Sequence, residues 1–363
     1  MISDFDSLLD WVCTVRNEVT EFMLLMKKRN GTFKYTLSGD LYPENTLSNL
    51  GANVFALKIF YALGIDDKEE INLVIDYVKR FQQSDGLFLD KFIFNRSFLR
   101  NFAASIKRRN FTNLTNWQYK VAETRQCISA LGLFNEKPIY EPYFFPTEPY
   151  GVIEYLEALN WRRPWDAGSH FSHLCFFLKR LEDSGNLTAT ECLKNAFDWI
   201  DRLQDSETGC WWKGSKPSDG ELVNGAMKIL TGYEAAARGY TKNADSLINF
   251  CLNLVNNTHA CGNFNILYVL DTAYRAVGAV ERRQELEAFI FERLKIFRTY
   301  WYPEYGGFSF FQRKSSDNYY GARVSRGLNE PDIHGTVMFI WGLSLISRIM
   351  NLQDESQLRP FIT

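Results

Sequence analysis

Helical periodicity is the feature that most constrains how this chain can fold. Apolar residues recur at i, i+3, i+4 and i+7 from end to end and strand-like alternation is scarce, which predicts a nearly all-helical protein. Some predicted helices are amphipathic, and they lie at about 5–28, 67–83, 148–159, 188–204, 242–256 and 282–300. The others are apolar on all sides, which predicts burial, and they lie at about 46–64, 117–134, 167–181, 222–238, 263–278 and 332–349.

A glycine followed two residues later by an aromatic residue recurs after several amphipathic helices. The pairs are Gly31 and Phe33, Gly86 and Phe88, Gly209 and Trp211, Gly306 and Phe308 and, more weakly, Gly262 and Phe264. A glycine past a helix end favours the left-handed turn, and the ring that follows is expected to pack against the helix pair. Because repeated units bury their faces against neighbours, six outer and inner helix pairs predict a single (α/α)6 toroid, an α-α barrel, in one domain over residues 1–363.

Composition and charge exclude several classes of protein. The chain is 46% hydrophobic and 23% charged, which is typical of a globular protein. Its 41 basic and 43 acidic residues give a formal net charge of −2, so no basic field predicts nucleic-acid binding. The acidic N-terminus, the lack of a continuous apolar run of about 18 residues, and seven cysteines without a C-x-x-C pair predict a cytoplasmic protein with free thiols.

Two of the recurring turns carry a more specific motif. Gln82-Gln-Ser-Asp-Gly86-Leu-Phe88 and Gln204-Asp-Ser-Glu-Thr-Gly209-Cys-Trp211 resemble the QW repeats of the terpenoid cyclase and protein prenyltransferase superfamily. A chain of this length has room for one toroid, and it therefore most resembles the single-domain class II terpene cyclases. The resemblance implies proton-initiated cyclisation of a linear polyprenyl or meroterpenoid substrate.

The chain departs from that family at the acid motif. The family's D-x-D-D-T-A sequence is missing, because Tyr268-Val-Leu-Asp271-Thr-Ala keeps only its last Asp. No Asp-x-Cys occurs, and this disfavours the prenyltransferase branch with its zinc site. Any catalytic acid is therefore expected at another position.

The start of the last inner helix offers one such acid. In Asn329-Glu-Pro-Asp332-Ile-His334, the proline marks a helix N-terminus and Asp332 is a favoured capping residue. Asp332 either caps the helix and does nothing more, or is a general acid whose pKa is raised by burial among rings. His334 is expected to hydrogen-bond Asp332 and orient it.

The second inner helix carries Glu123 and Arg125 in an otherwise apolar run, where charged groups are rarely buried unless paired. They are either a structural ion pair, or a second acid beside an arginine that binds a substrate carboxylate. Asn224, Asn263 and Asn265 are expected to cap helices. The other predicted substrate-binding residues are aromatic and lie in or beside the inner helices; they are Trp212, Tyr233, Phe264, Tyr268, Phe171 and Trp341.

Metal and cofactor signals are weak. His170 and His173 share a helix face at i, i+3 spacing, but no acidic cluster accompanies them, so no metal site is expected. Neither a G-x-x-x-x-G-K-[ST] loop nor a G-x-G-x-x-G after a strand occurs, and we expect no cofactor.

Residues 91–111 form a basic aromatic segment within an insertion at about 89–116. They hold six basic and no acidic residues, with Phe94, Phe98, Phe102 and Ile106 on one helical stripe. The segment is either a flap packed on the toroid, or a basic amphipathic helix that makes a peripheral contact with the inner membrane surface.

Two functions from different classes remain open. Aromatic residues make up 15% of the chain, and ring faces stabilise carbocations, which favours a class II cyclase with a hydrophobic isoprenoid substrate. The alternative is an (α/α)6 carbohydrate-active enzyme, a uronate lyase, hydrolase or epimerase of polysaccharide metabolism. There Tyr together with His170 and His173 would act as acid and base, and Trp would stack on sugar rings.

Overall fold

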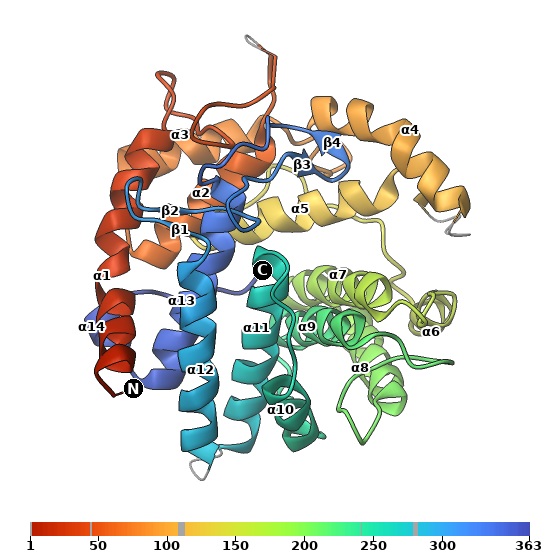
Figure 1. Ribbon diagram of the computed structural model, residues 1–363. Helices are drawn as coiled ribbons and strands as arrows, with labels where there is room; N and C mark the ends of the chain where they lie inside the picture. The colour runs from red at the N-terminus through yellow and green to blue at the C-terminus, as the bar shows by residue number, and fades with distance from the viewer. Residues whose placement is uncertain (1, 44–45, 108–112, 241, 279–281) are drawn as a thin grey trace. The chain divides into compact units, whose positions relative to one another are not determined.

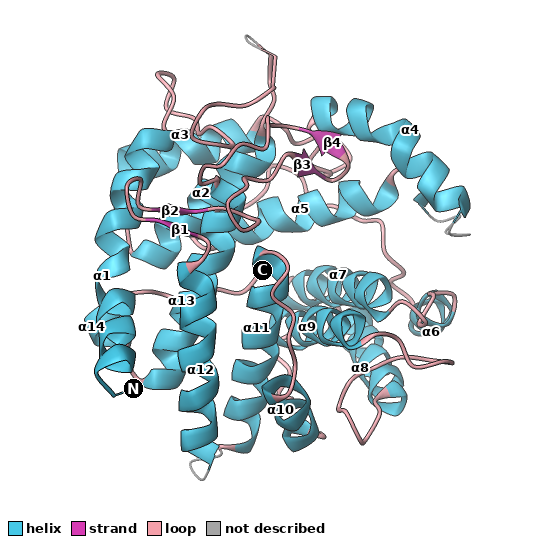
Figure 2. Ribbon diagram, viewed as in Figure 1, coloured by secondary structure: helices cyan, strands magenta, loops and turns pink. Residues whose placement is uncertain are grey.

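The computed structural model describes residues 2–43, 46–107, 113–240, 242–278 and 282–363. These residues are predominantly helical, with fourteen α-helices and two short antiparallel strand pairs among them (Figure 1, Figure 2). The all-α class predicted from the sequence is confirmed.

All twelve helices predicted from periodicity are present, with ends shifted by a few residues. The amphipathic ones are α1 (Ile2–Met26), α3 (Lys68–Lys79), α6 (Pro149–Glu157), α8 (Leu187–Leu203), α10 (Ala244–Leu252) and α12 (Arg283–Arg298). The apolar ones are α2 (Leu50–Leu63), α5 (Trp117–Gly132), α7 (Pro164–Asp183), α9 (Asp219–Ala235), α11 (Ala260–Val277) and α13 (Ile333–Met350). The other elements are α4 (Lys91–Lys107), α14 (Gln353–Ser356), β1 (Trp301–Tyr302), β2 (Gly307–Phe308), β3 (Asn318–Tyr319) and β4 (Ala322–Arg323).

The two kinds of helix differ in burial as their sequences predict. In α2 every residue except Tyr61 is buried, whereas α3 buries only Ile71, Val74, Ile75 and Val78 along one stripe. Helix α13 is long and apolar enough to cross a membrane by length and composition, but most of it is buried inside the protein. A helix that is apolar all round is what a protein core requires.

The described chain divides into two compact units. The first unit comprises Met1–Tyr143, Thr258–Cys261 and Arg293–Phe361, and the second comprises Phe144–Asn257, Gly262–Glu292 and Ile362–Thr363. In the first unit α2 packs against α13, α5 and α3. In the second unit α7 packs against α9 and α8.

Four of the predicted glycine turns share one geometry. In three of them a residue soon after the helix pairs with the aromatic residue six or seven positions later in an antiparallel bridge; the pairs are Lys27 with Phe33, Gln82 with Phe88, and Gln204 with Trp211. In the fourth, Trp301 pairs with Phe308 and Tyr302 with Gly307, as strands β1 and β2. The four glycines have φ between +70° and +85°, which favours glycine, and all four rings are fully buried. The chain therefore reverses sharply while each ring fills space against the helices.

In two of these turns the glutamine side chain forms hydrogen bonds that join the turn to a later segment of the chain. Gln82 donates from Nε2 to the carbonyls of Gly86 (2.9 Å) and Tyr140 (2.7 Å). Gln204 likewise donates to the carbonyl of Gly209 (2.7 Å) and to the hydroxyl of Tyr240 (2.8 Å). Each glutamine thus gives a hydrogen-bond partner to the carbonyl of its own turn glycine and ties the turn to a second loop.

Two smaller predictions were wrong. Gly262 lies inside α11, where it has no positive φ, so Gly262 and Phe264 form no turn. Of the asparagines expected to cap helices, Asn224 lies inside α9, which Ser218 caps instead, and Asn263 and Asn265 lie inside α11. Asn265 donates to Oδ1 of Asn224 (2.7 Å). Both errors arose because short polar and glycine residues also occur within buried helices.

Gly306 provides a test of the turn geometry. We expect Gly306→Ala to destabilise the protein by about 3 kcal/mol or more, because the residue is left-handed and the new Cβ would overlap the backbone carbonyl of Glu18 in α1. The matched control is Gly64→Ala in the same unit. Gly64 is also left-handed, but its nearest neighbour is the end of the Arg359 side chain at 3.2 Å, which can move, so a loss of about 1 kcal/mol is expected. Urea unfolding measures both, and equal losses would contradict the assignment.

Candidate functional site

Glu123 on α5 is a fully buried carboxyl group with an incomplete set of hydrogen bonds. Its Oε2 accepts a hydrogen bond from the Tyr319 hydroxyl (2.7 Å), whereas Oε1 has no hydrogen-bond partner among the residues that the structure describes. Burial raises the pKa of Glu123 to about 8, despite the opposing effects of Tyr319 and of the nearby Lys58 ammonium. The group is therefore protonated at neutral pH and can donate a proton.

Two local features bring the Tyr319 side chain to Glu123, a hairpin turn and a glycine on α2. The residue ends β3, and a tight turn through Tyr320 and Gly321, both with positive φ, leads to β4. Gly51 on α2 leaves room for the ring, since a Cβ there would lie 2.6 Å from Cε1 of Tyr319. A hairpin and a glycine therefore place the hydroxyl on a residue 196 positions earlier in the chain.

His334 lies in the first turn of α13 within a group of aromatic rings. It stacks on Phe55 (centroids 4.7 Å apart, planes at 16°) and packs against Phe310 (4.5 Å). A hydrogen bond of 3.1 Å joins its Nδ1 to the hydroxyl of Tyr35. Burial, with a smaller effect of His259, lowers the pKa of His334 to about 3, so the ring is neutral at pH 7 and can accept a proton.

Asp332 caps α13, as one of the two sequence interpretations predicts. Its Oδ1 accepts from the backbone N–H of Gly335 (2.7 Å), and its Oδ2 accepts from those of Phe310 (2.7 Å) and Ser316 (3.0 Å). Burial raises the pKa of Asp332 to about 7, while these N–H donors act in the opposite direction. The His334 ring bonds Tyr35 and not Asp332, so the expected orientation of Asp332 by His334 was wrong.

The structure brings together some of the predicted site residues and not others. Glu123 and His334 both contact Tyr319, whose ring centroid lies 6.1 Å from that of His334. Arg125 is buried on α5, and Trp212 is half-buried after a turn. The other predicted substrate-binding residues are at most 5% exposed and lie among core side chains; they are Phe171, Tyr233, Phe264, Tyr268 and Trp341. Their role in substrate binding stays a prediction.

Sequence analysis missed several residues of this site. Four residues without a motif contact His334, and one of them, Tyr319, also bonds Glu123; they are Tyr35, Phe55, Phe310 and Tyr319. One signal was available for Lys58, which interrupts the apolar run of α2 as Glu123 interrupts α5. Lys58 is 3% exposed and donates to Gln126 of α5.

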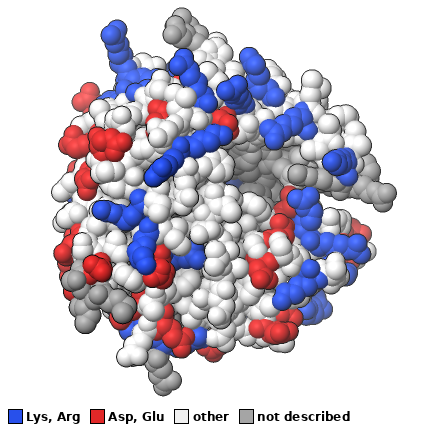
Figure 3. All heavy atoms as spheres, in the orientation of Figure 1, with Lys and Arg blue, Asp and Glu red and all other residues white. Residues whose placement is uncertain are grey.

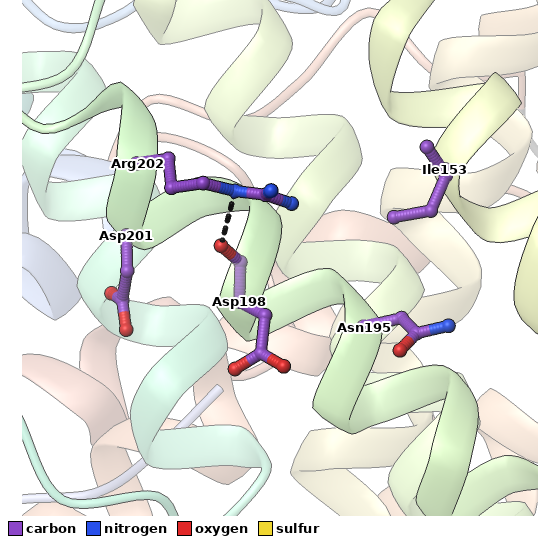
Figure 4. A pocket seen from close by; sticks show the side chains of 5 residues that line it. All are labelled: Ile153, Asn195, Asp198, Asp201 and Arg202. Atoms are coloured by element: carbon purple, nitrogen blue, oxygen red, sulfur yellow. Dashed lines mark hydrogen bonds between the residues drawn. The ribbon is translucent and has the colours of Figure 1, made fainter.

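The second unit contains a surface pocket and the two histidines of α7, His170 and His173. The pocket encloses about 490 Å³ between Ile153 on α6 and Asn195, Asp198, Asp201 and Arg202 on α8 (Figure 4). None of the predicted site residues lines it. Among the described residues, no three His, Cys, Asp or Glu side chains gather as metal ligands would.

One histidine of the second unit, His170, is hydrogen-bonded to Tyr155. The Tyr155 hydroxyl lies 2.8 Å from Nδ1 of His170, which is 7% exposed. Burial lowers the pKa of His170, against the opposing charge of Asp166. His173, one turn further along α7, is half-buried.

Comparisons of the chain with models of known protein families, with curated proteins and with solved structures gave no match.

The raised pKa of Glu123 has a consequence for stability. Between the unfolded pKa of about 4.3 and the folded pKa of about 8, the folded state keeps a proton that the unfolded state loses, so Glu123 lowers stability as pH rises. Glu123→Gln stays neutral in both states. We therefore expect the variant to gain up to about 4 kcal/mol on wild type between pH 5 and pH 8 in urea unfolding. A pH-independent difference would show that Glu123 is ionised in the folded protein.

Gly51 tests how Tyr319 is positioned. Gly51→Ala should improve helix propensity, yet we expect a net loss of about 1–3 kcal/mol because the Tyr319 ring must move away from Glu123. Gly132→Ala in α5 is the control, since no atom lies within 4 Å of its Cβ position and a small gain is expected. Thermal melting compares them, and a stabilised Gly51→Ala would refute the close contact.

Proposed function

We propose that this protein is a class II terpene cyclase in which Glu123 supplies the initiating proton. The observation that carries the proposal is the buried, neutral carboxyl of Glu123, whose Oε1 is free of hydrogen bonds in the described residues and whose Oε2 accepts from the Tyr319 hydroxyl. An acid that retains its proton at neutral pH and keeps one oxygen without a hydrogen-bond partner is what proton-initiated chemistry needs. Asp332 is the weaker candidate, because both of its oxygens already accept backbone N–H bonds.

The arrangement of helices supports an (α/α)6 toroid as the architecture. Helix α2 packs between α13 and α5, so the first inner helix lies against the last one as well as the second, as closure of a ring requires. The turns at Gln82 and Gln204, with their bonded glutamines and buried rings, support the resemblance to QW repeats. One toroid in one domain is part of the proposal.

The chemistry would proceed as an isomerisation. Glu123 gives its proton to the substrate, a carbon cation forms, and successive alkenes of the chain attack it to close rings. The last cation loses a proton to the neutral imidazole of His334, whose Nε2 has no hydrogen bond in the described part of the site. One proton enters and one leaves, so substrate and product have the same formula.

The pKa of Glu123 limits which functional group of a substrate it can protonate. A carboxyl group with a pKa near 8 holds its proton more tightly than an ordinary carboxylic acid, and is a weaker donor. An epoxide oxygen is far more basic than an alkene, and opening of the strained ring assists the transfer. We therefore propose a linear polyprenyl or meroterpenoid epoxide as the substrate.

The surrounding rings would stabilise the cation. Phe55, Tyr319 and Phe310 all pack around His334, and each desolvated ring face stabilises a cation by roughly 0.5–2 kcal/mol. In the tautomer that the reaction requires, the Nδ1–H of His334 donates to the hydroxyl oxygen of Tyr35, and the unprotonated Nε2 accepts the proton. These residues need no metal or cofactor for the reaction.

A carbohydrate-active enzyme is the second candidate, and the Tyr155–His170 pair favours it. A phenol hydrogen-bonded to a neutral imidazole can act as acid and base on a sugar, as β-elimination or epimerisation requires. In this alternative His170, and not Glu123, is essential.

The experiment incubates the purified protein with a linear polyprenyl epoxide and, separately, with the parent polyene. Mass spectrometry and NMR detect products of unchanged mass with fewer double bonds. We expect turnover of the epoxide and a loss of about 100-fold or more in Glu123→Gln, the range for a lost general acid. His170→Asn should retain turnover. Turnover that survives in Glu123→Gln, or no cyclised product from either substrate, would reject the proposal.

A further inference from the structure

The polar side of helix α4 packs against the rest of the first unit. The inward side chains include Ser97, Asn101 and Ser105, which are spaced four residues apart. Asn116 donates to Ser97 (2.9 Å) and accepts from Asn101 (2.9 Å), and Asn113 donates to Ser105 (3.2 Å). Hydrogen bonds, together with buried Ile93, therefore hold the helix in place.

The opposite side of α4 is apolar and faces solvent. Leu99 is 77% exposed, Phe102 39% and Ile106 50%, and the three lie at i, i+3 and i+7 on one stripe. Phe94 and Phe98, predicted on this stripe, are half-buried beside it, with ring centroids 5.6 Å apart. A helix that buries amides and hydroxyls while exposing large apolar side chains is inverted relative to an ordinary surface helix.

Basic residues flank the apolar stripe. Arg96, Arg100 and Lys107 are exposed along one edge, Lys91 lies at the start of the helix, and α4 contains no acidic residue. Figure 3 shows Lys and Arg atoms, and no Asp or Glu atoms, over the part of the face that α4 occupies in Figure 1. Arg108, Arg109 and Phe111 of the predicted segment lie outside the described residues.

We propose that this outer face of α4 binds the surface of an anionic lipid bilayer, with Leu99, Phe102 and Ile106 among the acyl chains and the basic edge at the headgroups. The whole protein carries a net charge of −2, so attraction to anionic lipid must come from a local patch such as this one. Basic edges beside an apolar stripe match an interfacial helix.

Charge and polarity disfavour two other partners for this face, a second copy of the chain and a nucleic acid. A second copy of the chain packed on the same face about a two-fold axis would bring its own basic edge close to Arg96 and Arg100. Nucleic acid would use the basic edge but would leave the apolar stripe in water. The inference is independent of the proposed reaction, because it concerns α4 alone.

The test is sedimentation of the full-length protein with two kinds of vesicle, phosphatidylcholine alone and phosphatidylcholine mixed with phosphatidylserine. We expect binding to the mixed vesicles that weakens as salt rises. The triple variant Arg96→Gln, Arg100→Gln, Lys107→Gln should bind on the order of 100-fold more weakly. The triple variant Leu99→Ser, Phe102→Ser, Ile106→Ser should lose a comparable factor and keep its melting temperature, because those side chains are exposed.

Matched controls lie in the second unit. Lys194→Gln, Lys213→Gln, Lys216→Gln changes the net charge equally at exposed positions, and Leu187→Ser removes an apolar side chain that is 85% exposed. Both should bind as wild type does. The proposal is overturned if wild type fails to bind mixed vesicles at low salt, if it binds pure phosphatidylcholine equally well, or if the lysine control loses as much affinity. Self-association that the serine variant abolishes, without vesicle binding, would assign the face to a second copy instead.

Discussion

The buried carboxyl group of Asp332 organises the part of the protein around which the proposed chemistry is built. It joins three backbone N–H groups, from the first turn of α13 and from Phe310 and Ser316 in the preceding segment. The backbone N–H of Asp332 also donates to the carbonyl of Phe308 (2.9 Å). Buried backbone groups must find partners, and one carboxyl provides them for a segment with little regular structure of its own.

That segment supplies one of the rings packed on His334 and the hydroxyl bonded to Glu123. Phe310 packs on His334, and Tyr319, only three residues after Ser316, hydrogen-bonds Glu123. The three titratable groups therefore have different tasks in the proposed mechanism. Asp332 holds backbone groups in place. Glu123 keeps its proton because it is buried and accepts a single hydrogen bond, and His334 stays neutral because burial disfavours its charged form.

Tertiary contacts also set the orientation of helix α4, because they decide which of its sides faces the protein. Asn113 and Asn116 bond its polar side, and this leaves Leu99, Phe102 and Ile106 exposed. An amphipathic sequence thus presents its apolar side outward. The proposed lipid contact rests on this orientation.

The sequence by itself determined the local features of this protein. The positions of twelve helices, their division into amphipathic and buried kinds, and the turns at Gly31, Gly86, Gly209 and Gly306 follow from periodicity and from backbone preferences of single residues. The cap at Asp332 is local as well, since its Oδ1 bonds an N–H three residues away. These features need no knowledge of distant contacts.

Only the tertiary structure decided between Glu123 and Asp332 as the better acid candidate. Asp332 was the first candidate from the sequence, but a local N–H group occupies its Oδ1 and two N–H groups 16 and 22 residues away occupy its Oδ2. Glu123 depends on a tyrosine that lies 196 residues away. The orientation of α4 likewise depends on amides outside that helix. Burial and hydrogen-bond partners set a pKa and an exposed face, and both are properties of contacts between segments that no local pattern encodes.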